Sequence, residues 1–167
     1  YGVVRTASGL PIAERLQQIH REMMAIVAAT DPAVVAVEQL FFATNVKTAM
    51  VVAHGRAACI LAATPGRQLV EYTPLQIKKA LTGHGQANKL QVQMMVRALL
   101  RLQEVPRPDH AADALGCALC HVHTLALGAK VAEALEAADS GALPAAEEMN
   151  PRKALLMQTR SARRRRR

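Results

Sequence analysis

Aromatic residues are scarce in this chain of 167 residues, which has no tryptophan, two tyrosines and two phenylalanines. Its three cysteines, an odd number, argue against a disulfide framework and are typical of a reducing compartment. No run of about 18 uncharged apolar residues occurs, since His54 and Arg56 interrupt the longest one, and this argues against a membrane span. The N-terminus also lacks the charged and apolar regions of a signal peptide. We therefore expect a cytoplasmic protein that binds no membrane.

Acidic residues are in the minority, and the excess of basic residues is concentrated at one end of the chain. Six of the 21 lysines and arginines lie in the last eight residues, at Arg160 and 163–167. The rest of the chain has 15 basic and 13 acidic residues, although the net charge of the whole is +8. A solvated arginine tail adds salt-dependent affinity for phosphates without reading any sequence. We expect one domain over residues 1–131 and a poorly packed extension with this tail over residues 132–167.

Short apolar runs alternate with longer helical patterns in the first part of the chain. The pattern predicts strands at residues 34–38 and 69–72, and helices at about 12–30, 45–64, 73–81, 87–102 and from 109 onwards. The continuous apolar run from Val34 to Val37 predicts a fully buried strand. Strands separated by helices imply parallel pairing and an α/β fold. The helix at 45–64 is rich in small residues, so it either packs tightly on the sheet or forms a subunit contact.

Ionisable side chains open the predicted helix that begins near Asp109. Residues three or four apart share a helix face, so His110 and Asp113 point the same way. Such a cluster suggests a divalent-metal site that a carboxylate from elsewhere must complete. Glu38 is the best candidate for that carboxylate, because it ends a strand and α/β sites are built at strand ends. Taken singly, Glu38 would be a solvated loop residue and Asp109 a helix cap.

Four groups of residues together carry a resemblance to a known family. They are Val37-Glu38-Gln39; Glu71-Tyr72 followed by Gln76-Ile77-Lys78; Ala87-Asn88-Lys89 with Gln91-Val92 and Met95-Val96-Arg97; and His110-Ala111-Ala112-Asp113-Ala114-Leu115. In this order and at nearly this spacing, over residues 1–127, the chain resembles the crossover junction endodeoxyribonuclease RuvC family. The resemblance implies a ribonuclease H-like α/β fold with a mixed sheet flanked by helices. It also implies a metal-dependent endonuclease that resolves Holliday (four-way) DNA junctions by paired symmetric nicks in recombination and repair.

Two departures from the family pattern affect the expected site. The family's first catalytic carboxylate is an Asp in an Asp-Pro-Gly motif on its opening strand, and nothing in this sequence matches it. We therefore expect the chain, which begins at Tyr1, to be a fragment without the first strand and most of the second. His110 stands where many members carry Asp. A histidine there keeps a metal ligand but removes one negative charge.

The resemblance assigns roles to individual residues and implies partners. The metal ligands would be Glu38, His110 and Asp113; the catalytic residues would be these three and Lys89; and the DNA-binding residues would be Phe41, Lys78 and Lys89. The cofactor would be Mg²⁺ or Mn²⁺, with two ions in each site to activate a water and neutralise the reacting oxygens. An imidazole ligand favours Mn²⁺ over Mg²⁺. The implied partners are four-way junction DNA, a second copy of the chain, and the branch-migration proteins RuvA and RuvB.

Each of these roles has a plainer alternative. Spacing alone would make His110 an ordinary interfacial histidine, and lysines such as Lys78 and Lys89 are most often surface residues. One phenylalanine of the pair at 41–42 would stack on an unpaired base if it is exposed, whereas both would be structural if they are buried. Cys117 and Cys120 have the spacing of a zinc pair, but a structural site needs a second pair and only Cys59 remains.

The function as a whole also has alternatives. The main alternative is a non-catalytic module that binds DNA junctions, because the first catalytic Asp has no match here. A nonspecific nucleic-acid binder driven by the arginine tail is a third interpretation, against which the low charge of the remaining residues counts.

Overall fold

The computed structural model describes residues 1–40 and 46–139 of the chain. Residues 1–126 form one compact unit, and a second unit begins at Leu127, within the last described helix. In chain order the elements are α1 (Ile12–Thr30), β1 (Val34–Glu38), α2 (Val46–Ala63), β2 (Gln68–Tyr72), α3 (Pro74–Thr82), α4 (Lys89–Leu99) and α5 (Asp109–Asp139). The predictions for Phe41 and Phe42, and the predicted start of a helix at residue 45, lie outside the described residues.

The two strands pair in parallel, as the alternation of strands and helices predicts. Val37 is opposite Glu71 and Glu38 is opposite Tyr72, so the carboxyl ends of both strands lie side by side. Strand β1 is only partly buried, and the expectation of a fully buried strand was wrong. Within residues 1–40 and 46–139 its only strand neighbour is β2, which leaves its other edge unpaired, and no antiparallel strand of a mixed sheet occurs there.

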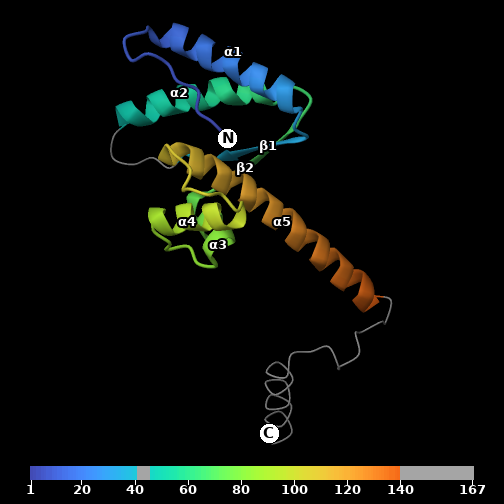
Figure 1. Cartoon of the computed structure of the whole chain (residues 1–167). Helices are drawn as coiled ribbons and strands as arrows, with labels where there is room; N and C mark the ends of the chain where they lie inside the picture. The colour runs from blue at the N-terminus through green and yellow to red at the C-terminus, as the bar shows by residue number, and fades with distance from the viewer. Residues whose placement is uncertain (41–45, 140–167) are drawn as a thin grey trace, which may run out of the picture. The chain divides into compact units, whose positions relative to one another are not determined.

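Helices flank the strand pair within residues 1–126, and the predicted α/β class is confirmed. Figure 1 shows α1 and α2 side by side above the strands, and α3, α4 and the beginning of α5 below them. The main apolar cluster joins β2 to these lower helices and consists of Tyr72, Ile77, Leu81, Ala87, Val92, Val96, Cys117 and Cys120. Ala36 of β1 and Val70 of β2 pack against this cluster. The strand pair therefore packs on the helices that carry the predicted site residues.

Capping boxes fix the beginnings of the two short helices. The Thr73 side chain accepts from the Gln76 amide at the start of α3, and Asn88 does the same for Gln91 at the start of α4. The Asn88 cap makes Lys89 the first residue of α4. Helix α4 ends at Leu99, three residues before the predicted end.

A turn at Arg101 causes this early end. Arg101 adopts a positive φ of 52°, which no helix residue has. The Leu102 amide bonds back to the Arg97 carbonyl, and the Arg101 amide to that of Ala98. These are the two hydrogen bonds of a Schellman motif, completed here by arginine in place of the usual glycine.

Helix α5 is 31 residues long and starts at Asp109, as the sequence predicts. It continues to Asp139, so the predicted boundary between residues 131 and 132 falls inside a helix and stays a prediction. By length and composition alone α5 could cross a membrane. A core helix passes the same test, and the first part of α5 is one, because Ala111, Ala112, Cys117 and Cys120 are buried.

Candidate functional site

Three of the predicted site residues meet in one cavity beside the end of β1. Glu38 ends β1, while His110 and Asp113 lie in the first turns of α5. All three line a cavity of about 390 Å³, together with residues of α2. The structure thus brings together a strand end and a helix start that are 75 residues apart, counted from Glu38 to Asp113.

A second hollow adds the two predicted lysines. Lys78 of α3 and Lys89 of α4 line a cavity of about 290 Å³ together with Glu38 and Asp113. Glu38 and Asp113 therefore border both cavities, whereas His110 lines only the larger one and the two lysines line only the smaller one. Phe41, the remaining predicted DNA contact, is outside the described residues.

The electrostatics of Glu38 reflect this crowding. Partial burial raises the pKa of the Glu38 carboxyl, the nearby Asp113 raises it further, and Lys89 lowers it. The two carboxylates thus repel each other when both are ionised. A cation placed between them would remove that repulsion.

Lys89 lies close to two carboxylates at the start of α5. Its Nζ lies 3.1 Å from Oδ2 of Asp109 and 3.8 Å from Oδ2 of Asp113. Gln93, which is on the next turn of α4, donates from Nε2 to Oδ1 of Asp109 at 3.0 Å. Asp109 is therefore not the helix cap that the sequence suggested, because its carboxylate bonds these two side chains of α4 and not the first amides of α5.

His110 lies at the margin of the site. Its Nδ1 is 3.9 Å from Oδ2 of Asp113, but its side chain is 88% exposed. Within residues 1–40 and 46–139, no group of three or more His, Cys, Asp or Glu side chains is close enough to enclose a metal ion. The residues present nevertheless fit part of a coordination shell, since two repelling carboxylates are oxygen ligands of the kind that Mg²⁺ and Mn²⁺ prefer.

An arginine of α2 also contacts this site, and the sequence reasoning missed it. Arg56 lines the larger cavity, and its Nη2 bonds Oε1 of Glu71 on β2. Its Nε lies 3.4 Å from the carbonyl oxygen of Glu38. In the sequence Arg56 stands out only as a charge that interrupts an apolar run, and no motif marks it as a site residue.

Two cysteines of α5 lie near the site, and Cys117 lines the larger cavity. Cys117 and Cys120 are buried free thiols in α5. Burial, the neighbouring Cys120 and Glu38 together raise the pKa of Cys117 to about 11. In the absence of a metal ion, a thiol with this pKa stays protonated near neutral pH.

Comparison with known proteins identifies the family. Residues 1–121 match the family described as "Crossover junction endodeoxyribonuclease RuvC". The chain belongs to the RuvC family. A RuvC of Alkaliphilus oremlandii is 49% identical over 125 residues, which cover 74% of this chain and 76% of that protein. RuvC of Halothermothrix orenii is 47% identical over 131 residues, which cover 78% and 79% of the two chains.

Solved RuvC structures share the fold. Thermus thermophilus RuvC is 40% identical with a TM-score of 0.70, and the match covers 76% of this chain and 77% of that one. T. thermophilus RuvC in complex with Holliday junction substrate is also 40% identical, with a TM-score of 0.72 and coverage of 76% and 78%. The predicted ribonuclease H-like fold is therefore confirmed. So is the predicted enzyme class, a crossover junction endodeoxyribonuclease of a metal-dependent family, and the non-catalytic alternative is not favoured.

Proposed function

We propose that this chain resolves Holliday junctions through a metal site built on Glu38, Asp113 and His110, with Lys78 and Lys89 facing the DNA. The observation that carries the proposal is the shared position of the two carboxylates. Glu38 and Asp113 border both cavities and are close enough for Asp113 to raise the pKa of Glu38. Two carboxylates that repel each other at the end of a strand are typical of a site that binds a cation.

The ligands of the cation would be Glu38, Asp113 and the imidazole of His110. In our proposal each site binds two Mg²⁺ or Mn²⁺ ions. When bound, these ions would supply an activated water and neutralise charge on the scissile phosphate. The imidazole of His110 is largely exposed and lies 3.9 Å from Oδ2 of Asp113. Glu38 and Asp113 border both cavities, whereas His110 borders only the larger one.

The lysines would position the phosphodiester backbone. Lys89 is the first residue of α4, where the unpaired amides of the helix already favour an anion. Lys78 approaches the same cavity from α3. We propose Phe41, which follows Glu38 by three residues, as a stacking partner for an unpaired base.

The decisive experiment separates cleavage from binding. In the full-length protein, Glu38→Gln and Asp113→Asn should each abolish cleavage of a four-way junction while junction affinity stays within about twofold. The reason is that metal ligands act on the chemical step, whereas phosphate contacts supply most of the affinity. Glu104→Gln is a matched control, because Glu104 is an exposed acid in the loop before α5 and lines neither cavity.

Two outcomes would contradict the proposal. Equal losses of cleavage and binding in both variants would mean that these carboxylates have a structural role. A wild-type protein that binds junctions but cleaves none with either metal would support the alternative function, a non-catalytic junction-binding module.

We also propose that the chain acts as a homodimer, because a two-fold enzyme matches the two-fold symmetry of a four-way junction. Exposed apolar side chains on α2 support this: Met50, Val51, Val52 and Leu61. Leu61→Glu should therefore lower the mass measured by sedimentation equilibrium to that of a monomer. We further propose RuvA and RuvB as partners, and a pull-down on junction DNA tests this. The proposed location is the cytoplasm.

The arginine tail at the end of residues 132–167 is proposed to add affinity without adding recognition. Removing residues 160–167 takes away six arginines. We expect weaker binding to junction and plain duplex alike, a shallower salt dependence, and unchanged cleavage positions. If the truncation instead erased the preference for junctions over duplex, the tail would be part of recognition.

A further inference from the structure

Lys89 lies between two carboxylates that have different tasks in the proposed site. Its ammonium is 3.1 Å from Asp109 and 3.8 Å from Asp113, so Asp109 is the nearer partner. Asp113 is the carboxylate that we assign to the metal. A cation and an ammonium that shared one oxygen of Asp113 would repel each other, and each would weaken the binding of the other.

We propose that Asp109 is a positioning residue, which holds the ammonium of Lys89 beside the site and leaves the carboxylate of Asp113 open to the metal ion. This inference rests on the proposed function, in which Asp113 is a metal ligand and Lys89 faces the scissile strand. The inference adds to the site a residue that is not one of the proposed metal ligands. Asp109 would touch neither the metal nor the DNA.

The orientation of Asp109 supports this role. Its two oxygens are divided between two donors, with Oδ1 accepting from Gln93 and Oδ2 facing Lys89. Gln93 is the anchor, because it is only 9% exposed and sits on α4, one turn after Lys89. Because the nearly buried amide of Gln93 holds Oδ1, Oδ2 of the half-exposed Asp109 side chain is directed towards Lys89.

The charges around this network agree with the geometry. The hydrogen bond to Lys89 and that from Gln93 are the main reasons why the pKa of Asp109 lies below its ordinary value. The hydrogen bond to Asp109 is the largest cause of a raised pKa at Lys89, ahead of the attraction of Asp113 and Glu38. Arg107 is the other cation that acts on Asp109, and its effect is smaller than that of Lys89.

Direct metal binding by DNA-free, full-length protein tests the proposal. Free Mn²⁺ is measured by electron paramagnetic resonance in titrations of wild type, Asp109→Asn and the charge-matched control Glu104→Gln. Asparagine keeps an acceptor for Gln93 but loses the charge that holds Lys89, so Lys89 should shift to Asp113. We expect Asp109→Asn to bind Mn²⁺ about three- to fivefold more weakly than Glu104→Gln, which is the scale of an exposed ion pair.

Two further variants show that the effect acts through Lys89. In a Lys89→Met background, Asp109→Asn should no longer weaken Mn²⁺ binding, because the competing ammonium is gone. Asp109→Glu keeps the charge and should recover most of the affinity. In cleavage assays, Asp109→Asn should raise the Mn²⁺ concentration for half-maximal rate by the same factor and change the rate at saturating Mn²⁺ much less.

The outcomes distinguish this inference from the proposed function. Equal Mn²⁺ affinities for Asp109→Asn and Glu104→Gln would overturn the role of Asp109, as would an undiminished effect in the Lys89→Met background. Unchanged Mn²⁺ affinity in Asp113→Asn would instead overturn the proposed metal site, and the positioning role would fall with it.

Discussion

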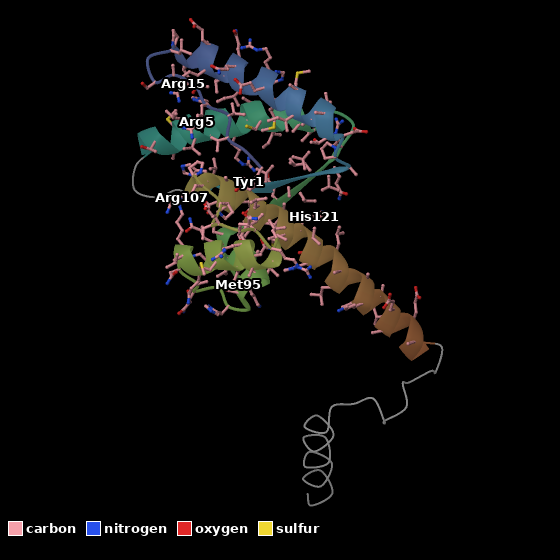
Figure 2. All side chains as sticks on the ribbon, in the orientation of Figure 1. Tyr1, Arg5, Arg15, Met95, Arg107 and His121 are labelled. Carbon is pink, nitrogen blue, oxygen red and sulfur yellow. The ribbon has the colours of Figure 1, made fainter. Side chains whose placement is uncertain are left out.

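The hydroxyl of Tyr72 lies 2.8 Å from Nδ1 of His121, and this contact joins the end of β2 to α5. Figure 2 shows His121 on α5, in the half that adjoins the rest of residues 1–126. Tyr72 is also the register partner of Glu38, and its carbonyl accepts from the amide of Gln39 at 2.8 Å. One tyrosine therefore connects the strand that carries Glu38 to the helix that carries Asp113.

Tyr72→Phe should lower the free energy of unfolding by about 1–3 kcal/mol, because it leaves Nδ1 of the partly buried His121 without its partner. Nε2 of the same ring is already buried with no partner in the described chain, so the imidazole would lose its last hydrogen bond. Urea unfolding measures the change, and Tyr1→Phe at an exposed tyrosine is the control. Equal stability of the two variants would show that the contact contributes nothing.

Glu38→Gln should stabilise the metal-free protein at neutral pH. The folded-state pKa of Glu38 is raised above 4.5, so the folded state binds its proton more tightly than the unfolded state does. Ionised Glu38 therefore destabilises the fold above its folded pKa, and this penalty disappears as the pH falls through that pKa towards 4.5 and below. Thermal unfolding in the presence of a chelator should show wild type and variant converging at acid pH. A constant difference at all pH values would contradict the assignment.

Lys78→Gln should reduce cleavage by about tenfold or more, whereas Lys79→Gln should leave it nearly unchanged. The two residues are neighbours in α3 and lose the same charge, but only Lys78 lines the cavity with Glu38 and Asp113. A charge that positions a phosphate matters more than an exposed one on the same helix. Junction cleavage under single-turnover conditions measures both. Equal effects would mean that the two lysines act only through overall charge.

His110→Asp should bring the rates with Mg²⁺ and Mn²⁺ closer together. The wild-type protein should cleave better with Mn²⁺, because nitrogen ligands favour Mn²⁺ and a neutral imidazole lowers the negative charge of the site. Aspartate restores an all-oxygen site, and His110→Ala should impair cleavage with both metals. Titrations of each metal with the three proteins decide the matter. An unchanged metal preference in His110→Asp would mean that His110, at 3.9 Å from Asp113, is not a ligand.

Local chemistry predicted the elements of the fold well. Thr73-Pro74 marks the start of α3, and apolar runs mark both strands, because caps and β-branched runs act within a few residues. The early end of α4 could not be predicted, since a Schellman turn normally shows a glycine and Arg101 takes its place. The partial burial of β1 depends on how many strands flank it, which no local pattern encodes.

The candidate site was predictable where it rests on spacing and not where it rests on tertiary contacts. Helical periodicity places His110 beside Asp113, and strand-end logic points to Glu38. The contact of Asp109 with Gln93 crosses from α5 to α4, and only the packing of those helices creates it. The residue roles themselves remain predictions, because they depend on a metal and a DNA that the geometry alone does not supply.

Helix α5 carries Asp113 at its beginning and His121 two turns later, and the two residues face different partners. Each residue added to a helix turns everything beyond it by about 100°. An insertion between Asp113 and His121 would therefore rotate one of them out of place while the other kept its contacts. This stretch should therefore accept no change in length, whereas the loop between α4 and α5 lies outside that constraint and is the better place to lengthen the chain.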